Sequence, residues 1–161
     1  MTEYDSTIDT EKHIERVACL LLLAIQKLTS RAARHDRSKL ESPEKEIFDE
    51  YTPKLKGSTY GSDEYKEFLK GMGVALKHHY ENNRHHPEHF TPLVAHLNIV
   101  DEISGMTLVD LIEMLCDWKA ATERHENGDI IKSLEINQKR FGISPQLNEV
   151  FKNTAKELGW I

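Results

Sequence analysis

Residues 63–86 read DEYKEFLKGMGVALKHHYENNRHH, and this stretch decides the fold. Apolar and aromatic residues recur in it at steps of three and four, which is the period of an amphipathic α-helix. The same stripe takes in His79 and leaves out His78, so we expect His79 to face the interior. Pro87 disfavours helical backbone at the residue before it, so the helix should end there and release its last two histidines into a turn. The stripe consists of Tyr65, Phe68, Leu69, Met72, Leu76, His79, Tyr80 and Asn83.

The rest of the chain also divides into helical lengths, and no segment alternates convincingly as a strand would. We therefore predict an all-α protein with six or seven helices in a single compact domain. Its core should cover about residues 10–128, with a helical extension over 129–161. The stretches 57–62 and 87–105 are expected to be irregular. The helices expected elsewhere run from Asp9 or Thr10 past Leu28, over Arg31–Leu40, from Ser42-Pro43 to just before Pro53, from Thr107 past Trp118, over Ile130–Lys139, and from Ser144-Pro145 to about Leu158.

Composition narrows the class of protein. The chain has 161 residues, of which 39% are hydrophobic and 30% charged, a balance typical of a globular domain. Its net charge of −6 argues against a nucleic-acid partner bound through overall positive charge. The strongest apolar run, residues 18–25, is too short to span a bilayer, and the acidic N-terminus does not fit a signal peptide. Because Cys19 and Cys116 form no CxxC motif, we expect buried free thiols in a cytoplasmic protein with no membrane partner.

Histidine is the unusual residue of this chain: there are nine, and five fall between His78 and His89. A metal site needs donors that converge from different elements, and imidazole with carboxylate suits Mn, Fe, Co, Ni or Zn. His13 shares an apolar helical stripe with Val17 and Leu20, so we expect it to point inward. Asp36 has two oxygens and could bridge two ions. The candidate donors are His13, His35, Asp36, His79, His86 (with His85 as the alternative) and Asp117.

Each candidate also has an ordinary explanation. A histidine on an apolar stripe is usually a hydrogen-bonded core residue. The pair His35 and Asp36 would otherwise be an exposed polar pair, and Asp117 a solvated helix acid. Lys39 could simply pair with a nearby acid such as Glu44, a contact worth little in free energy.

The segment His35-Asp36-Arg37-Ser38-Lys39 resembles the signature of the HD-domain metal-dependent phosphohydrolase superfamily. The order H…HD…H…H…D is similar to that of its two-metal branch, although only six or seven residues separate the last two histidines here. The chain also resembles a family of small bacterial and phage proteins of unknown function that share three elements. In this sequence they are His35-Asp36-Arg37-Ser38-Lys39, His79 with Asn83-Arg84-His85-His86, and Glu113-Met114-Leu115-Cys116-Asp117-Trp118.

The resemblance implies an HD-like helical fold and hydrolysis of a phosphate ester or anhydride, with a small nucleotide as substrate. One or two divalent transition-metal ions would supply the attacking water. His13, His35, Asp36 and Asp117 would hold the first ion, and His79 and His86 the second, with Asp36 as the bridge.

The same resemblance implies roles for the polar residues around the ions. Lys39 would contact a phosphate oxygen or the attacking water, and Glu113 would orient a ligand histidine. Substrate contacts would come from Arg37, Arg84 and Asn83. Two other functions stay open: a di-iron oxygenase of HD type, and a non-catalytic metal- or nucleotide-binding module. The oligomeric state is also left open.

Overall fold

The computed structural model describes residues 4–58, 62–92, 102–124 and 127–161. Within these residues the chain forms seven α-helices and three short 3₁₀ helices, with no strand, which confirms the predicted all-α class. The chain divides into two compact units, Met1–His35 and Asp36–Ile161, and each is described by itself. None of the described helices is long and apolar enough to cross a membrane. The elements are α1 (Thr7–Arg34), η1 (Arg37–Leu40), α2 (Glu44–Gly57), α3 (Asp63–Gly71), α4 (Gly73–Asn82), η2 (Pro87–Phe90), η3 (Glu102–Gly105), α6 (Leu108–Thr122), α7 (Ile130–Phe141) and α8 (Pro145–Glu157).

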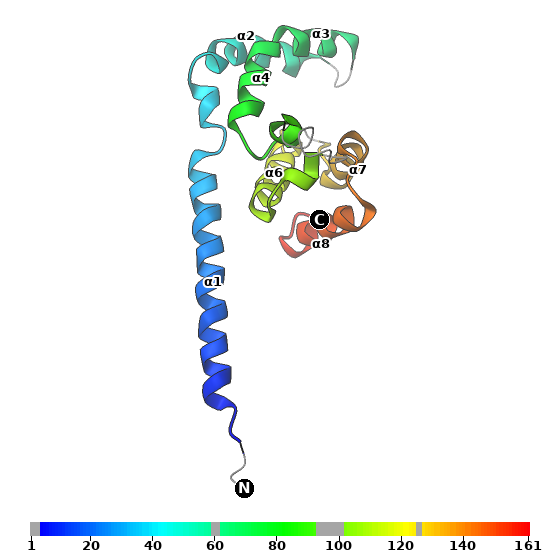
Figure 1. The fold of residues 1–161 in the computed structure, drawn as a ribbon. Coiled ribbons are helices and arrows are strands. Elements are labelled where there is room, and N and C mark those ends of the chain that lie inside the picture. Colours follow the sequence, from blue (N-terminus) through cyan, green and yellow to red (C-terminus); the bar gives the residue numbers. More distant parts are fainter. Residues whose placement is uncertain (1–3, 59–61, 93–101, 125–126) are drawn as a thin grey trace. The chain divides into compact units, whose positions relative to one another are not determined.

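The first unit is α1, one continuous helix (Figure 1). It extends through Arg34, so the residues from Arg31 onward continue the first helix and do not begin a second. His35 ends it, and its backbone N–H donates to the carbonyl of Arg31 at 2.8 Å. A single helix taken alone has no core, and no residue of α1 is buried. The inward position of His13 therefore stays a prediction.

The second unit begins at Asp36, whose backbone is in the left-handed conformation. Asp36 has φ 55°, a conformation that interrupts a right-handed helix and that aspartate tolerates better than most residues. The chain then makes the short η1, whose Lys39 N–H donates to the carbonyl of Asp36 at 3.0 Å. The prediction of one helix over Arg31–Leu40 was wrong for this reason.

Helix α2 packs against η1, α3 and α4. Pro43 is its N-cap and Glu44 its first residue, one position later than predicted, because the carbonyl of Glu41 accepts the N–H groups of Glu44 and Lys45 at 3.1 and 2.9 Å. The helix also continues through Pro53, where the sequence predicted that it would end. A proline inside a helix costs about 3 kcal/mol. The packing of α2 on its neighbours offsets that cost.

The decisive stretch forms two helices, α3 and α4, which meet at Met72. Every member of the predicted stripe is buried or half-buried, and of the two adjacent histidines His79 keeps 1% of its side chain exposed and His78 38%. The break falls between two glycines. A Cβ at Gly71 would overlap the ring of Tyr51 on α2, so the close approach of α2 requires glycine at this position.

Helices α6, α7 and α8 share one hydrophobic cluster, so residues 129–161 belong to the core and are not an extension of it. The predicted cap Ser144 is present, since its hydroxyl accepts the N–H of Leu147 at 3.2 Å, and Thr107, near which a helix was expected to start, accepts the N–H of Asp110 at 3.2 Å. The first helix begins at Thr7 with Ser6 as its N-cap, so its predicted start at Asp9 or Thr10 was wrong. Cys116 on α6 is exposed, so the expectation of a buried thiol was wrong there, and for Cys19 on α1 it stays a prediction, as it does for His13. Parts of the two stretches expected to be irregular, 59–61 and 93–101, lie outside the described residues. The hydrophobic cluster shared by α6, α7 and α8 consists of Leu111, Met114, Leu115, Ile130, Leu134, Phe141, Ile143 and Phe151.

Candidate metal centre

Asp36 begins the site, and its left-handed backbone directs its carboxylate toward α4. The Oδ1 atom lies 3.3 Å from Nε2 of His79 and 3.4 Å from Nε2 of His85. The Oδ2 atom accepts from Nζ of Lys39 at 2.6 Å. The two oxygens of one carboxylate therefore face different partners, the imidazoles on one side and an ammonium on the other.

His79 lies on the buried face of α4 with 1% of its side chain exposed. Its Nδ1 lies 2.8 Å from Oε2 of Glu44, the first residue of α2. Burial acts to raise the pKa of Glu44, but hydrogen bonds from His78, Ser38 and His79 outweigh it and lower the pKa. An ionised carboxylate only accepts, so Nδ1 of His79 donates to Glu44, and Nε2 faces Asp36 and His86.

His85 and His86 leave α4 in the turn before Pro87, as the sequence predicted. His85 is buried, with Nδ1 3.3 Å from Oε1 of Glu113 on α6 and Nε2 toward Asp36. His86 is half-buried, and its Nε2 lies 2.9 Å from Nε2 of His79. The sequence offered these two histidines as alternatives, and the structure brings both to the same point.

Four donors thus converge within the second unit: Oδ1 of Asp36 and one ring nitrogen from each of His79, His85 and His86, all within 4.8 Å of one another. For donors about 2.1 Å from an ion, neighbours lie about 3.4 Å apart in a tetrahedron and about 3.0 Å apart at a right angle. Three of the six separations are 2.9, 3.3 and 3.4 Å, close to these values, and the other three are within 4.8 Å. The donor set of three imidazoles and one carboxylate suits a transition-metal ion.

The charge around the donors also favours a cation. Four carboxylates lie in or beside the cluster, those of Asp36, Glu44, Glu113 and Asp117, and the ammonium of Lys39 pairs with Asp36. Burial lowers the pKa of His86 to about 3, and the neighbouring His85 and His79 act in the same direction. Neutral imidazole is the form that binds metals.

Ser38 and Asn83 fix the position of His79 from the side. The amide of Asn83 donates to the hydroxyl of Ser38 and to the carbonyl of His79, both at 2.8 Å. Asn83 is 9% exposed, so its amide is engaged inside the protein. The structure gives it a structural role, and the predicted substrate contact stays a prediction.

Arg84 turns away from the four donors. Its guanidinium forms two hydrogen bonds to Asp110, at 3.2 and 2.9 Å, and its Cζ lies 4.9 Å from the centre of the Phe90 ring. Asp110 is fully buried and also caps α6 through Thr107. Arg37, the other basic residue expected at the substrate, is exposed on η1.

Three predicted ligands are not among the four converging donors: Asp117, His13 and His35. Asp117 on α6 is half-buried, and one of its oxygens lies within 4.8 Å of a ring nitrogen of His85. Its charge raises the pKa of His86, which opposes the effect of burial there. His13 and His35 belong to the first unit, and their part in a metal site stays a prediction.

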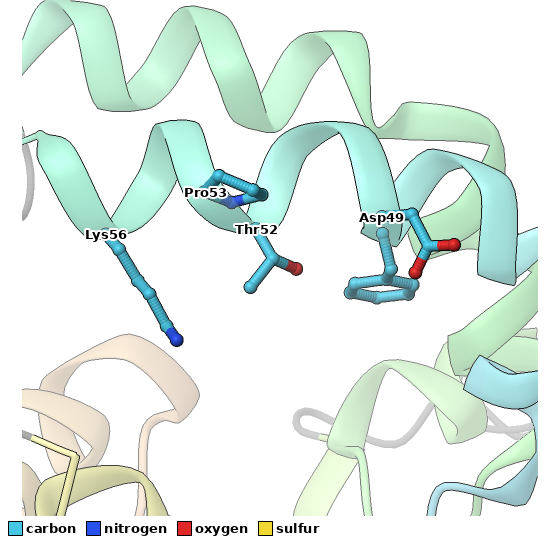
Figure 2. A pocket seen from close by; sticks show the side chains of 5 residues that line it. Asp49, Thr52, Pro53 and Lys56 are labelled. Atoms are coloured by element: carbon cyan, nitrogen blue, oxygen red, sulfur yellow. The ribbon is translucent and has the colours of Figure 1, made fainter.

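A hollow opens on one face of α2, lined by side chains of that helix (Figure 2). Phe48 connects the hollow to the donors, because its ring centre lies 6.1 Å from that of His79 and 5.3 Å from Nζ of Lys39. The hollow measures about 370 Å³, within the range of small-ligand pockets. Its lining residues are Phe48, Asp49, Thr52, Pro53 and Lys56.

Sequence reasoning missed three residues of the site: Glu44, Ser38 and Phe48. Ser38 stands inside the HDxSK element and could have been found there. Glu44 and Phe48 follow no motif, since an acid at a helix start is normally solvated and Phe48 looks like an ordinary apolar helix residue. Their roles arise from the packing of α2 on α4.

Comparison with known proteins identifies a family for the chain but does not identify an activity. No curated protein matches the chain, and no solved structure matches it. One family model covers residues 2–157, nearly the whole length. The chain belongs to this family, DUF5662, described as a family of unknown function.

Proposed function

We propose that this protein is a metal-dependent phosphohydrolase of HD type that cleaves a phosphate ester or anhydride of a small nucleotide. The observation that carries the proposal is the convergence of Oδ1 of Asp36 with ring nitrogens of His79, His85 and His86. The HDxSK element, which provides Asp36, supports the hydrolase class by resemblance. A bound dication would supply an acidic water and neutralise charge on the phosphoryl group.

The exposure of the donors gives the direction from which a substrate would approach. His79 and His85 are 1% and 2% exposed, whereas Asp36 and Lys39 keep 19% and 30% of their side chains exposed. The open side of the cluster is therefore the side of η1. Lys39 stands there with its ammonium beside Asp36, in position to donate to a phosphoryl oxygen.

The hollow on α2 is the place for the rest of the substrate. Phe48 offers an aromatic edge or face beside the metal ligands, and Thr52 a hydroxyl farther along the helix. Lys56 is exposed and forms no ion pair within the described residues, so its charge is available to an anionic group. An aromatic ring flanked by two lysines fits a nucleotide better than a simple sugar phosphate.

The test is a panel of nucleoside mono-, di- and triphosphates and phosphodiesters, assayed with Mn²⁺, Co²⁺, Ni²⁺, Zn²⁺ and Fe²⁺. The wild-type protein should release phosphate or a nucleoside from a member of the panel. Asp36→Asn should lower that rate at least about a hundredfold, because it removes the charge of a ligand. Asp63→Asn is the matched control: Asp63 is an exposed acid at the start of α3 that pairs with Lys66 and lies outside the hollow, so activity should persist.

Failure of every substrate with a metal-loaded wild-type protein would overturn the hydrolase proposal. Iron retained from expression together with visible absorption, and no hydrolysis, would instead place the chain among di-iron oxygenases.

A further inference from the structure

Glu44 is the buried acid that the proposed reaction does not use. It is fully buried at the start of α2. The other fully buried acid of the described residues, Asp110, pairs with Arg84 and caps α6. Glu44 has no lysine or arginine partner among the described residues. A buried carboxylate costs several kcal/mol without compensation, so its partners should explain it.

Those partners are two consecutive histidines of α4. Oε1 lies 2.7 Å from Nδ1 of His78, and Oε2 lies 2.8 Å from Nδ1 of His79. Only one of the two imidazoles continues toward the metal donors, since the Nε2 of His79 faces Asp36 and His86. His78 is 38% exposed and is absent from the donor cluster.

We propose that Glu44 is a positioning residue of the metal centre, which holds His79 with its proton on Nδ1 and its Nε2 lone pair aimed at the ion. The proposal rests on the metal site of the proposed function and not on hydrolysis. A carboxylate behind a ligand imidazole fixes the tautomer and makes the ligand nitrogen more basic. Glu113 stands in the same relation to His85, with its Oε1 3.3 Å from Nδ1. Two of the three imidazoles are thus backed by buried or nearly buried carboxylates.

This role depends on the charge of Glu44 and not on its volume. A purely structural residue at this position could be replaced by a neutral side chain of the same shape with little loss, because burying the charge is itself unfavourable. A positioning role predicts the opposite: the neutral isostere should fold and bind metal poorly. Glu44→Gln keeps the shape and one acceptor oxygen and removes the charge.

The experiment measures Mn²⁺ and Zn²⁺ affinity of the full chain by titration calorimetry, with circular dichroism as the check on folding. Glu44→Gln should bind either ion about 10- to 100-fold more weakly than the wild type while keeping its helical signal. His78→Ala is the matched control, because it removes the other imidazole on the same carboxylate and leaves His79 in place. Its metal affinity should stay close to that of the wild type.

A second readout follows the tautomer directly. Side-chain ¹⁵N spectra of the metal-free protein should show His79 protonated on Nδ1 in the wild type and a mixture of tautomers in Glu44→Gln. A wild-type His79 protonated on Nε2 would overturn the proposal without any variant, even if Glu44→Gln failed to fold.

Three further results would overturn it: no metal bound by the wild type, unchanged metal affinity in a folded Glu44→Gln, or an equal loss of affinity in His78→Ala. Metal binding that depends on Glu44 without any hydrolysis would leave this inference standing and would refute the proposed activity alone. The two failures are therefore separable.

Discussion

Asp36 combines an unusual backbone with the central ligand position. It is the non-glycine residue with positive φ in the described chain. Left-handed backbone costs about 1 kcal/mol for most residues, less for aspartate and nothing for glycine. Such strain persists where the surroundings require it, and here it sets the carboxylate between Lys39 and the imidazoles.

Two substitutions at Asp36 should distinguish the effect of its backbone conformation on stability from the effect of its carboxylate on metal binding. Asp36→Gly and Asp36→Ala both remove the carboxylate, so both should lose bound metal. Urea unfolding of the metal-free proteins should show glycine more stable than alanine by about 1 kcal/mol, because only alanine must adopt the strained conformation. Equal stabilities would contradict the importance of the left-handed backbone.

Lys39 should affect metal binding and hydrolysis in opposite directions. Its ammonium lies 2.6 Å from Oδ2 of Asp36 and competes with an ion for that carboxylate. We expect Lys39→Met to bind Mn²⁺ at least as tightly as the wild type, and to hydrolyse the substrate about 10- to 100-fold more slowly. Calorimetry and steady-state kinetics measure the two quantities.

Lys70→Met is the control for Lys39→Met, since Lys70 makes a similarly short pair with Glu67 on the exposed surface of α3. It should change neither metal affinity nor rate. Weaker metal binding by Lys39→Met would show that the lysine holds Asp36 in place and does not compete with the ion.

Among single residues, the sequence predicted four that converge, Asp36, His79, His85 and His86, and it named Glu113 behind them but missed Glu44. The helical period selected His79 over His78, and Pro87 released His85 and His86 into a turn. Asp36 was found through its motif. The burial of Glu44 could not be predicted from the sequence, because it results from contact between α2 and α4, which lie far apart in sequence.

Among the elements, the break between α3 and α4 depends on Gly71. Gly71→Ala should destabilise the protein by about 1–3 kcal/mol in urea unfolding, because the new methyl group overlaps the ring of Tyr51. Gly73→Ala is the control: a Cβ there meets no atom within 4 Å, and alanine favours helix. That variant should be neutral or slightly stabilised. A stable Gly71→Ala would contradict the close approach of α2.

The pair Arg84–Asp110 ties the turn after α4 to the start of α6. Arg84→Ala should lower the free energy of unfolding by about 1–2 kcal/mol, a modest cost because the guanidinium is 42% exposed. It should leave the KM for the substrate unchanged. Arg140→Ala, which breaks an exposed pair with Glu88, is the control and should cost less. A raised KM in Arg84→Ala alone would restore the predicted substrate contact.

The starts of α6 and α8 were predicted well, whereas α1 begins earlier and α2 one residue later than the local signals indicated, and boundaries that depend on packing were missed. Thr107 and Ser144 cap α6 and α8 through their own side chains, which a sequence displays directly. The helix end predicted before Pro53 and the unbroken helix predicted through Gly71–Gly73 were both wrong, because these features depend on the packing of α2 against α3 and α4. The helix that was expected to run unbroken to Pro87 has its interruption where Tyr51 approaches.

For the whole molecule, the structure divides the chain after His35 and includes residues 129–161 in the core of the second unit. The sequence predicted one domain with a C-terminal extension. Periodicity shows which face of a helix is apolar and does not show which helix covers it. For this reason the all-α class could be predicted and the division of the chain could not.

The four described donors all belong to the second unit, so that unit should hold one ion without the two histidines of the first unit. We expect the double variant His13→Ala/His35→Ala to retain one Mn²⁺ or Zn²⁺ per chain in elemental analysis after dialysis. A loss of one ion relative to the wild type would assign the missing ion to these histidines. Complete loss would contradict a site formed by Asp36, His79, His85 and His86 alone.

The most direct test of the metal centre is the metal content of purified wild-type protein and of Asp36→Asn, each loaded with Mn²⁺ or Zn²⁺ and dialysed. Asparagine keeps the size of the side chain and tolerates left-handed backbone, so the variant changes little except the ligand charge. We predict at least one ion per chain in the wild type and almost none in Asp36→Asn. Equal metal content in the two proteins, or none in the wild type, would contradict the site.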